Sequence, residues 1–497
     1  MAMRLSGLMS GMDTESIIQE LVAVKKTKVD DATKAQKKLE WKQEAWKSLN
    51  TKLKSLQSKY VANMRFTSAY TKKTTKVSNN SAVSVITGEG AVNGTQELEV
   101  KQLAKTAYLT SAKVTGENGS KLNAMSKLSD INSSFTGGEI TFTQNGETKT
   151  MEVGANTTIS DVLTQLKKWG VNASFDANNQ RFFVSAKESG KANDFTLGGS
   201  ADALAALGLS ESAGATKIGG QDAVITLNKA EFTSSSNVFE INGLTLTALQ
   251  ETKEGETVAV TTQNDTDGVY DMIKNFLKEY NSVINEIDKL YNADSASGYE
   301  PLTNEEKEAL TETEVEEWEE KIKDALLRRD SNLSSVSSVL KSAMSTSIEI
   351  GGKKMYLSDF GISTPGYFAA AENEKNAYHI DGDPDDELTS GNGDKLKSMI
   401  ANDPETVINF FAKFAQNLYG KMDDMTQSVK GYRSYGSFFD DKKMQSDYDD
   451  YTKEIKELEQ KLADYEDKWY AKFSAMETAM AKMQSNVSAV TSMLGGS

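Results

Sequence analysis

The fold of this chain is decided by its C-terminal stretch, residues 448–494, which reads YDDYTKEIKELEQKLADYEDKWYAKFSAMETAMAKMQSNVSAVTSML. Apolar side chains recur there in steps of three and four, which keeps them on one narrow stripe of a helix. Each large side chain on so narrow a stripe gains its roughly 1.5–3 kcal/mol of burial free energy only against another helix. The stretch therefore predicts a coiled-coil seam, at Tyr448, Tyr451, Ile455, Leu458, Leu462, Tyr465, Trp469, Phe473, Met476, Met480, Met483, Val487, Val490 and Leu494.

The N-terminal part of the chain offers a partner helix. The same spacing occurs there, interrupted by Lys42, at Leu39, Trp46, Leu49, Leu53, Leu56 and Tyr60. Between Leu21 and Leu39 the seam positions are mostly Lys and Ala, so we expect this stretch to be frayed in isolation or to pair with another subunit. Helices over residues 13–66 and 448–494 would each be on the order of 70–80 Å long, which favours an antiparallel pair. The alternative is two unrelated surface helices.

Composition limits the other possibilities. A chain of 497 residues is expected to form three or four domains, and 38% hydrophobic with 26% charged residues is typical of globular proteins. The absence of Cys excludes disulfides, zinc fingers and thiol nucleophiles. No apolar run approaches the roughly 20 residues that span a bilayer, and the start of the chain lacks a signal-peptide pattern. We therefore expect no membrane insertion, and any export by a route without a cleaved signal.

Charge is unevenly distributed. The first 73 residues hold 15 Lys and Arg against 7 Asp and Glu, although the chain as a whole carries a net charge of −16. The two ends of the chain are therefore expected to attract each other. The lysines fall on the polar side of the expected helix without an aromatic stacking platform, so no nucleic-acid binding is expected.

Past Tyr70 the sequence changes to strands. One hairpin is predicted from Glu139 to Val153 with a tight turn at Asn145-Gly146, and a second from Val171 to Ala186 with a turn at Asn178-Asn179. A short amphipathic helix, residues 159–169, separates them and ends before Gly170. Further strands are predicted to pair with residues 76–115, at residues 223–227, 238–241, 244–249 and 258–261.

Helical periodicity returns after residue 267. An amphipathic helix is predicted from Val269 to Ile287, and two capping boxes mark helix starts at Thr303 with Glu306 and at Thr311 with Glu314. Two further apolar helix faces flank Pro404.

These elements predict an α+β multidomain fold in which the terminal helices pair as a coiled-coil stalk that carries a helical domain and two inserted β-rich domains. The expected leg comprises residues 1–45 and 450–497, and the helical domain residues 46–75 and 267–449. The first β-rich domain is expected at residues 76–124 and 216–266, and the outer one, inserted into it, at residues 125–215.

Candidate catalytic groups are few. His379 is the only histidine, and it lies in a strand-like context without a nucleophile elbow elsewhere. Asp359-Phe360-Gly361 lacks the other kinase motifs and is interpreted as a turn. Asp381, Asp383 and Asp385 have the opening spacing of a calcium loop, but Asp386 replaces the required Gly, which favours a solvated acidic loop. No enzyme activity, cofactor or metal site is predicted.

Residues 7–21, GLMSGMDTESIIQEL, closely resemble the opening signature of the bacterial flagellar filament cap, the hook-associated protein 2 family, with Met12 in place of a more usual Leu. Residues 125–215 are the least specific part of the match, and residues 381–393 resemble a local insertion. The resemblance recurs at residues 220–223, 236–237, 242–246, 280–281, 299–303, 318–321, 326–330 and 357–362.

This resemblance implies a structural cap at the distal end of the flagellar filament. Family members form a homo-oligomeric ring whose legs dock where flagellin emerges, so that each flagellin folds and inserts beneath the cap. The implied partners also include the hook–filament junction protein and a flagellar export chaperone. The implied location is extracellular, at the flagellum tip, reached by the flagellar type III route. Docking on neighbouring subunits or flagellin is expected of Leu8, Met12, Ile17, Ile18, Leu21, Met483, Val487, Val490 and Leu494.

Two alternatives remain open from the sequence. Another flagellar axial component, such as a junction protein or flagellin itself, shares helical ends but normally polymerises into tubes. A surface adhesin would instead use its β domains to bind a ligand.

Overall fold

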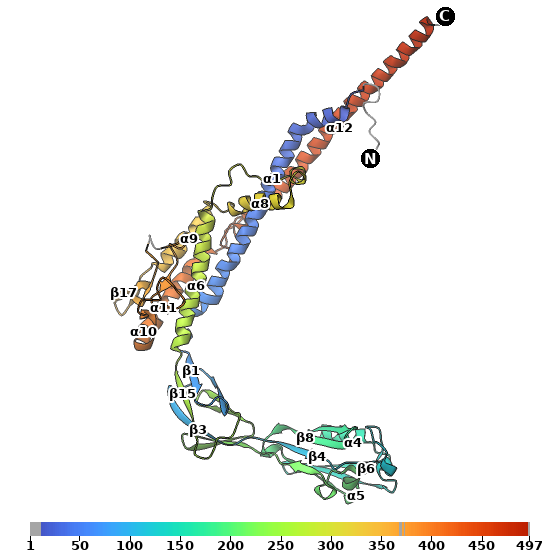
Figure 1. Cartoon of the computed structure of the whole chain (residues 1–497), viewed down its shortest axis with the longest axis vertical. Helices are drawn as coiled ribbons and strands as arrows, with labels where there is room; N and C mark the ends of the chain where they lie inside the picture. The colour runs from blue at the N-terminus through green and yellow to red at the C-terminus, as the bar shows by residue number, and fades with distance from the viewer. Residues whose placement is uncertain (1–10, 367–369, 372, 496–497) are drawn as a thin grey trace. The chain divides into compact units, whose positions relative to one another are not determined.

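The computed structural model describes residues 11–366, 370, 371 and 373–495, except for the side chains of residues 493 and 494. The chain divides into two units (Figure 1). Residues up to Tyr70, together with those from Thr266, form the helical unit, and Thr71–Asp265 form the β unit. The expected fold class is confirmed: paired terminal helices, a helical domain and β-rich insertions occur in one chain.

The helical unit contains two long helices drawn from opposite ends of the chain, α1 (Thr14–Ser55) and α12 (Asp441–Leu494). They lie side by side over much of their length, and α12 continues beyond the start of α1 (Figure 1). Asp13 caps α1 by accepting a hydrogen bond from the amide of Ser16 at 3.1 Å. A π-helical turn, Leu56–Val61, continues α1 into the core, so the predicted helix over residues 13–66 is confirmed with a local irregularity.

The core of the helical unit is built around α6 (Thr266–Tyr291) and α11 (Pro404–Met425). Pro404 occupies the first turn of α11, where its missing N–H costs no hydrogen bond. The ring of Phe360 contacts both Phe410 and Phe411, with centroids 4.4 and 5.2 Å apart. Two further helices pack around α6 and α11: α9 (Ser331–Met344) and α10 (Lys395–Asn402).

Both predicted capping boxes are confirmed. They begin α7 (Asn304–Glu308) and α8 (Glu312–Asp324). In each box the Glu side chain accepts a hydrogen bond from the amide of the capping Thr, and the Thr hydroxyl accepts one from the amide of the Glu. α8 lies against α1 through a small apolar cluster of its own.

The β unit contains two apolar cores. The first core is formed mainly by side chains of a five-stranded antiparallel sheet, in the order β1-β15-β3-β11-β12, and of a three-stranded sheet, β13-β14-β2. Burial alternates along these strands, as at Leu244, Leu246 and Ala248, because successive side chains point to opposite faces. The strands are β1 (Lys73–Val77), β2 (Val83–Thr87), β3 (Gly94–Gln102), β11 (Ala223–Leu227), β12 (Ala230–Ser234), β13 (Val238–Ile241), β14 (Leu244–Ala248) and β15 (Val258–Asn264).

The second core lies among two further antiparallel sheets, β6-β5-β9 and β10-β4-β8-β7, and the helices α4 (Ile159–Lys168) and α5 (Ala201–Leu207). Both predicted hairpins are present, and Asn145 and Gly146 adopt φ values of 53° and 79°, as a type I′ turn requires. The strands are β4 (Thr106–Thr110), β5 (Gly137–Gln144), β6 (Glu147–Gly154), β7 (Asn172–Asp176), β8 (Arg181–Ser189), β9 (Phe195–Gly199) and β10 (Thr216–Ile218).

The strand pairing differs from the expected division at residues 124 and 125. β4, expected with the first β-rich domain, instead pairs with β8 and places Ala107 and Leu109 in the second core. Sequence periodicity identifies a strand but not its neighbour, because pairing is a contact between distant residues. The exact domain bounds therefore remain predictions.

Several elements were not predicted. Among them are α5, β9, β12, α9, the hairpin β16 (Ile348–Ile350) with β17 (Lys353–Met355), and the first turns of α12, which begins at Asp441 rather than Tyr448. α9 is rich in serine, and its apolar positions Leu333, Val336 and Leu340 give a weak periodic signal.

Candidate docking surface on the leg

The leg consists of α1 and the part of α12 from Tyr448 onward, and its two helices are antiparallel. Near the start of α1, the hydroxyl of Tyr470 donates to Glu15 at 2.7 Å. Further along, Gln36 Nε2 donates to Thr452 Oγ1 at 2.6 Å and to the carbonyl of Tyr448 at 3.3 Å. Rising numbers in α1 meet falling numbers in α12, so the expected antiparallel pair is confirmed.

The face that α1 turns toward α12 contains polar residues. Along this face Ile18 and Ala32 are buried and Val22, Val29 and Gln36 are half-buried. With the exposed Lys25 between Val22 and Val29, these positions alternate in steps of three and four. The Lys25 ammonium lies 5.8 Å from the centre of the Tyr465 ring, a cation–π contact. The stretch before Leu39, expected to be frayed or to await another subunit, is thus helical and uses its polar side chains against α12.

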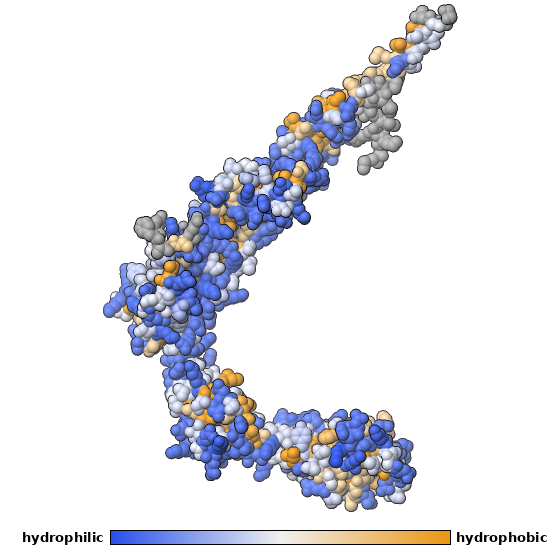
Figure 2. Space-filling model, in the orientation of Figure 1, coloured by the Kyte–Doolittle hydropathy of each residue, from blue (hydrophilic) through white to orange (hydrophobic). Residues whose placement is uncertain are grey.

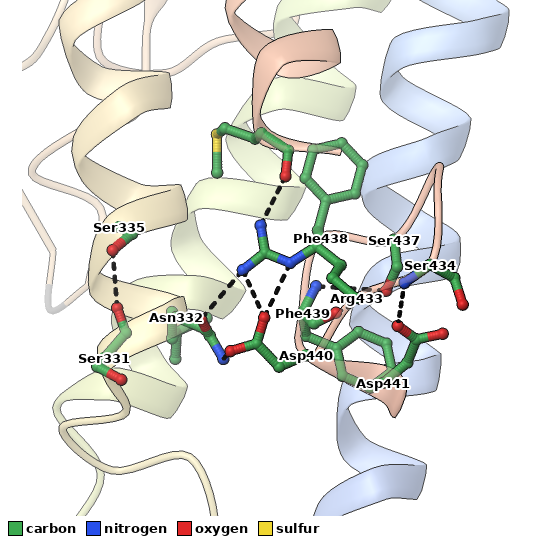
Figure 3. A network of polar contacts seen from close by, with 12 residues as sticks. Ser331, Asn332, Ser335, Arg433, Ser434, Ser437, Phe438, Phe439, Asp440 and Asp441 are labelled. Atoms are coloured by element: carbon green, nitrogen blue, oxygen red, sulfur yellow. Dashed lines mark hydrogen bonds and ion pairs between the residues drawn. The ribbon is translucent and has the colours of Figure 1, made fainter. Parts of the chain in front are cut away.

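The base of the leg is fixed by Arg433, which lies in the loop before α12 (Figure 3). Its guanidinium donates to Asp440 Oδ1 from Nε at 3.0 Å and from Nη2 at 2.8 Å. It also donates from Nη1 to the carbonyl of Met425 at 2.7 Å, and from Nη2 to Asn332 Oδ1 at 3.4 Å. The planar fork of arginine thereby ties the loop to the end of α11 and the start of α9.

Two more contacts join this loop to α1. The rings of Trp46 and Phe439 stack with centroids 5.4 Å apart, and the amide of Phe438 donates to Asn50 Oδ1 at 2.9 Å. Two residues after Phe439, burial would raise the pKa of Asp441, but hydrogen bonds from Ser434 and from the amides of Lys442 and Asp441 together hold that pKa below its usual value. The first turn of α12 therefore keeps a negative charge near the positive end of the helix dipole.

The end of α12 exposes an apolar stripe. Up to Met480 the seam residues from Tyr451 are half-buried, whereas Met483, Val487 and Val490 are 62%, 63% and 53% exposed. Apolar patches occur along this part of α12 in the space-filling view (Figure 2). The repeat that faces α1 thus continues beyond the described part of α1.

The other predicted docking residues lie at different depths. Met12 and Leu21 are exposed and Ile17 is half-buried, but Ile18 is 1% exposed because it packs within the leg. Ile18 therefore offers no free surface in this state. Leu8 and the side chain of Leu494 lie outside the described residues. Sequence reasoning missed Val24, which is highly exposed and follows Ile17 and Leu21 at helical spacing.

The residues considered for catalysis or calcium binding make ion pairs and hydrogen bonds with other side chains. Lys274 Nζ pairs with Asp383 at 2.6 Å and Asp385 at 2.7 Å, and its hydrogen bond lowers the pKa of Asp385. His379 lies in β19 (His379–Ile380), where its Nδ1 is 2.5 Å from Asp386 Oδ2. Phe360 and Gly361 end a short 3₁₀ turn, as expected. Within the described residues, no group of three or more His, Asp or Glu side chains is placed to hold a metal ion.

None of the helices within the described ranges combines the length and the apolar character that crossing a membrane would need.

Comparison with known proteins identifies the family. Residues 10–107 match the family model "Flagellar hook-associated protein 2 N-terminus", and residues 220–485 match "Flagellar hook-associated protein 2 C-terminus", which alone covers more than half of the chain. A flagellar hook-associated protein 2 from Halalkalibacterium halodurans is 25% identical over 526 residues, covering 96% of this chain and 97% of that protein. One from Thermotoga maritima is 25% identical over 361 residues, covering 70% of this chain and 54% of that protein.

A solved structure shares the fold. The D1-D2-D3 domains of the flagellar cap protein FliD from Escherichia coli align with a TM-score of 0.50 and 19% identity, covering 82% of this chain and 99% of that one. In this chain the paired terminal helices, the helical core and the β-rich insertion occur together, and models of the same family match both its N-terminal and its C-terminal part. The chain belongs to the flagellar hook-associated protein 2 family.

Proposed function

We propose that this chain is a structural cap at the distal end of the bacterial flagellar filament, where copies form a ring that promotes folding and insertion of exported flagellin. Family membership supports the flagellar role. The observation that carries the docking role is the exposed stripe of α12, where Met483, Val487 and Val490 continue the seam in register beyond α1. A helix from a neighbouring molecule could cover this stripe with the same packing that α1 provides further down.

The proposed docking surface comprises Met12, Ile17, Leu21, Met483, Val487 and Val490, with Leu8 and Leu494 as further candidates. Val24 adds apolar area beside Leu21. Partners proposed for this surface are flagellin, other copies of the chain and, during export and assembly, the export chaperone and the hook–filament junction protein. Location at the flagellum tip and export by the flagellar type III route belong to the same proposal. The role needs no bond-making residue, and we propose no enzyme activity.

The test mixes purified chain with filaments and monomeric flagellin and examines filament tips by electron microscopy. The wild-type chain is expected to form closed particles at tips and to support elongation. Val487→Asp should abolish tip binding, because burying a charge in an apolar seam costs several kcal/mol. Ser485→Asp adds the same charge on another face of α12 and should retain binding.

The same images test the rival role. Long helical polymers made by the chain itself would favour a tube-forming axial component, and normal tip binding by Val487→Asp would refute docking through the stripe.

A second candidate function is supported by the outer face of the sheet β10-β4-β8-β7. Tyr108 lies directly opposite Ser185 and Ile218, and Phe183 lies opposite Thr110. Tyr108, Phe183 and Ile218 are exposed, which places aromatic rings among hydroxyl groups. Such a face could bind a surface glycan, and a glycan-binding screen with residues 71–265 would test the adhesin role.

A further inference from the structure

The two helices of the leg are held unequally. Among the described residues, α1 is the only element with which α12 packs extensively, whereas α1 packs against α12, α6 and α8. The additional support comes from the connection between α6 and α9. We call residues 299–330, which include α7 and α8, the strap.

The apolar part of the strap encloses Trp41 of α1. Trp41, Ile322 and Leu326 are buried together in a cluster separate from the main core. Lys323 of the strap places its ammonium 4.8 Å from the centre of the Trp41 ring. The rings of Tyr299 and Trp318 pack beside this cluster with centroids 4.6 Å apart. This contact buries a side of α1 that does not face α12.

Ion pairs extend the contact in both directions along α1. Lys26 pairs with Glu305, and Lys34 pairs with Glu306 at 2.9 Å. Lys42 pairs with Asp330 at 2.7 Å, and Asp330 also caps α9 by accepting the amide of Leu333. The basic charge of the N-terminal region is therefore used in part against the strap, although the sequence favoured attraction between the two chain ends.

The contacts of α12 are of a different kind. Its ion pairs at Lys443, Lys453 and Lys461 are made within the helix itself. The seam side chains of α12 from Tyr451 to Met480 are half-buried against α1. The contacts that Lys25 and Gln36 of α1 make with α12 can be replaced by contacts with water when the two helices separate. Its anchor is at the base, through Arg433 and Phe439.

We propose that the strap makes α1 the fixed helix of the leg and α12 the moving one. The leg opens when α12 separates from α1 along the seam, while α12 remains attached at its base and α1 stays on the strap. Opening exposes the whole apolar stripe of α12, from Tyr451 to Val490. This opening of the leg is proposed for the chain on its own in solution, and it does not depend on the proposed function.

Hydrogen–deuterium exchange of the full chain, followed by mass spectrometry, tests the order of opening. Amides of residues 451–480 in α12 are expected to exchange at least about tenfold faster than amides of residues 26–42 in α1. Equal rates, or faster exchange in α1, would overturn the proposal.

A substitution in the strap tests its role without changing α1. Ile322→Ala removes apolar contact around Trp41 and should accelerate exchange of residues 26–42 at least about tenfold, toward the rate of α12. Thr313→Ala, at an exposed position of α8, is the matched control and should leave that exchange unchanged. Undiminished protection of α1 in Ile322→Ala would show that the strap does not hold it.

If Ile322→Ala unfolds the helical unit, exchanging the charges of one ion pair between α1 and the strap provides the test instead. Lys26→Glu should accelerate exchange around residue 26 by about twofold, since exposed ion pairs contribute little, and Lys26→Glu with Glu305→Lys should restore it. Lys28→Glu, at an exposed position two residues further along α1, is the control. Failure of the double variant to restore protection would count against the strap contact.

Discussion

At the scale of single residues, the leg combines an apolar repeat with polar side chains at defined points. Gln36 occupies a position on the α12-facing side of α1 where leucine would bury more apolar surface. A polar residue at a seam position of a coiled coil reduces stability but selects one register, because other alignments leave its hydrogen bonds unmade. Lys25, opposite the ring of Tyr465, adds a second such constraint.

We predict that Gln36→Leu strengthens the pairing of α1 with α12 by up to about 1 kcal/mol but loosens its alignment. Since the chain has no Cys, spin labels on cysteines introduced at Lys28 and Lys461 report the distance across the leg without interference. The distance distribution should broaden in Gln36→Leu and remain narrow in Lys47→Ala, an exposed control. An unchanged distribution would show that Gln36 does not set the register.

Arg433 is the residue on which the base of α12 depends (Figure 3). Arg433→Lys retains the charge but cannot reach Asp440, Asn332 and the carbonyl of Met425 together. We expect a loss on the order of 2 kcal/mol in the unfolding free energy of the helical unit, measured by thermal unfolding. Lys430→Arg, at an exposed position of the same loop, should have no effect. A comparable loss in both variants would contradict this role.

At the scale of elements, the strap relies on carboxylates that must be ionised. The amide of Thr303, followed by the ammonium of Lys34, holds the pKa of Glu306 below its ordinary value of 4.5. The unfolded chain therefore takes up this proton at a higher pH than the folded strap does. The stabilisation that the ionised Glu306 gives to the folded strap is complete above pH 4.5, and it is lost as the pH falls through the lowered pKa of Glu306.

We predict that the strap loosens from α1 in acid for this reason. Spin labels at positions 28 and 308, in samples frozen between pH 7 and pH 3, should show a longer and broader distance only at the acidic end. Glu306→Gln should show a looser strap at neutral pH and a weaker pH dependence. A pH response as large as that of the wild type in Glu306→Gln would assign the effect to other groups.

At the scale of the whole molecule, stability is divided among separate cores. The helical unit has its own large core, and the two cores of the β unit are built from different residues. A unit with its own core can fold without the rest of the chain.

We therefore expect residues 71–265, expressed alone, to fold and to unfold cooperatively on heating. Their transition should coincide within about 3 °C with one of the transitions of the full chain, since a shift of that size in a domain of this length corresponds to roughly 1 kcal/mol. Circular dichroism and calorimetry on both proteins provide the comparison. A fragment without a transition, or a full chain that melts in a single step, would contradict independent folding.

Much of this architecture follows from local patterns in the sequence. The seam of α12 as far as Met480, the capping boxes before α7 and α8 and the turn at Asn145-Gly146 depend on residues close together in the chain, and the structure confirms each of them. The stripe at Met483, Val487 and Val490 is equally visible in the repeat. Its docking role stays a prediction, since a repeat specifies a surface but not what covers it.

Other features were decided by the tertiary structure alone. The partner of β4, the face of α1 that meets α12, the strap around Trp41 and the three-way contact of Arg433 all join residues far apart in the sequence. Periodicity determines which side of an element is apolar, because it reflects the geometry of one helix or strand. It does not determine which neighbour covers that side, because the choice depends on the fit among all the surfaces that the folded chain brings together.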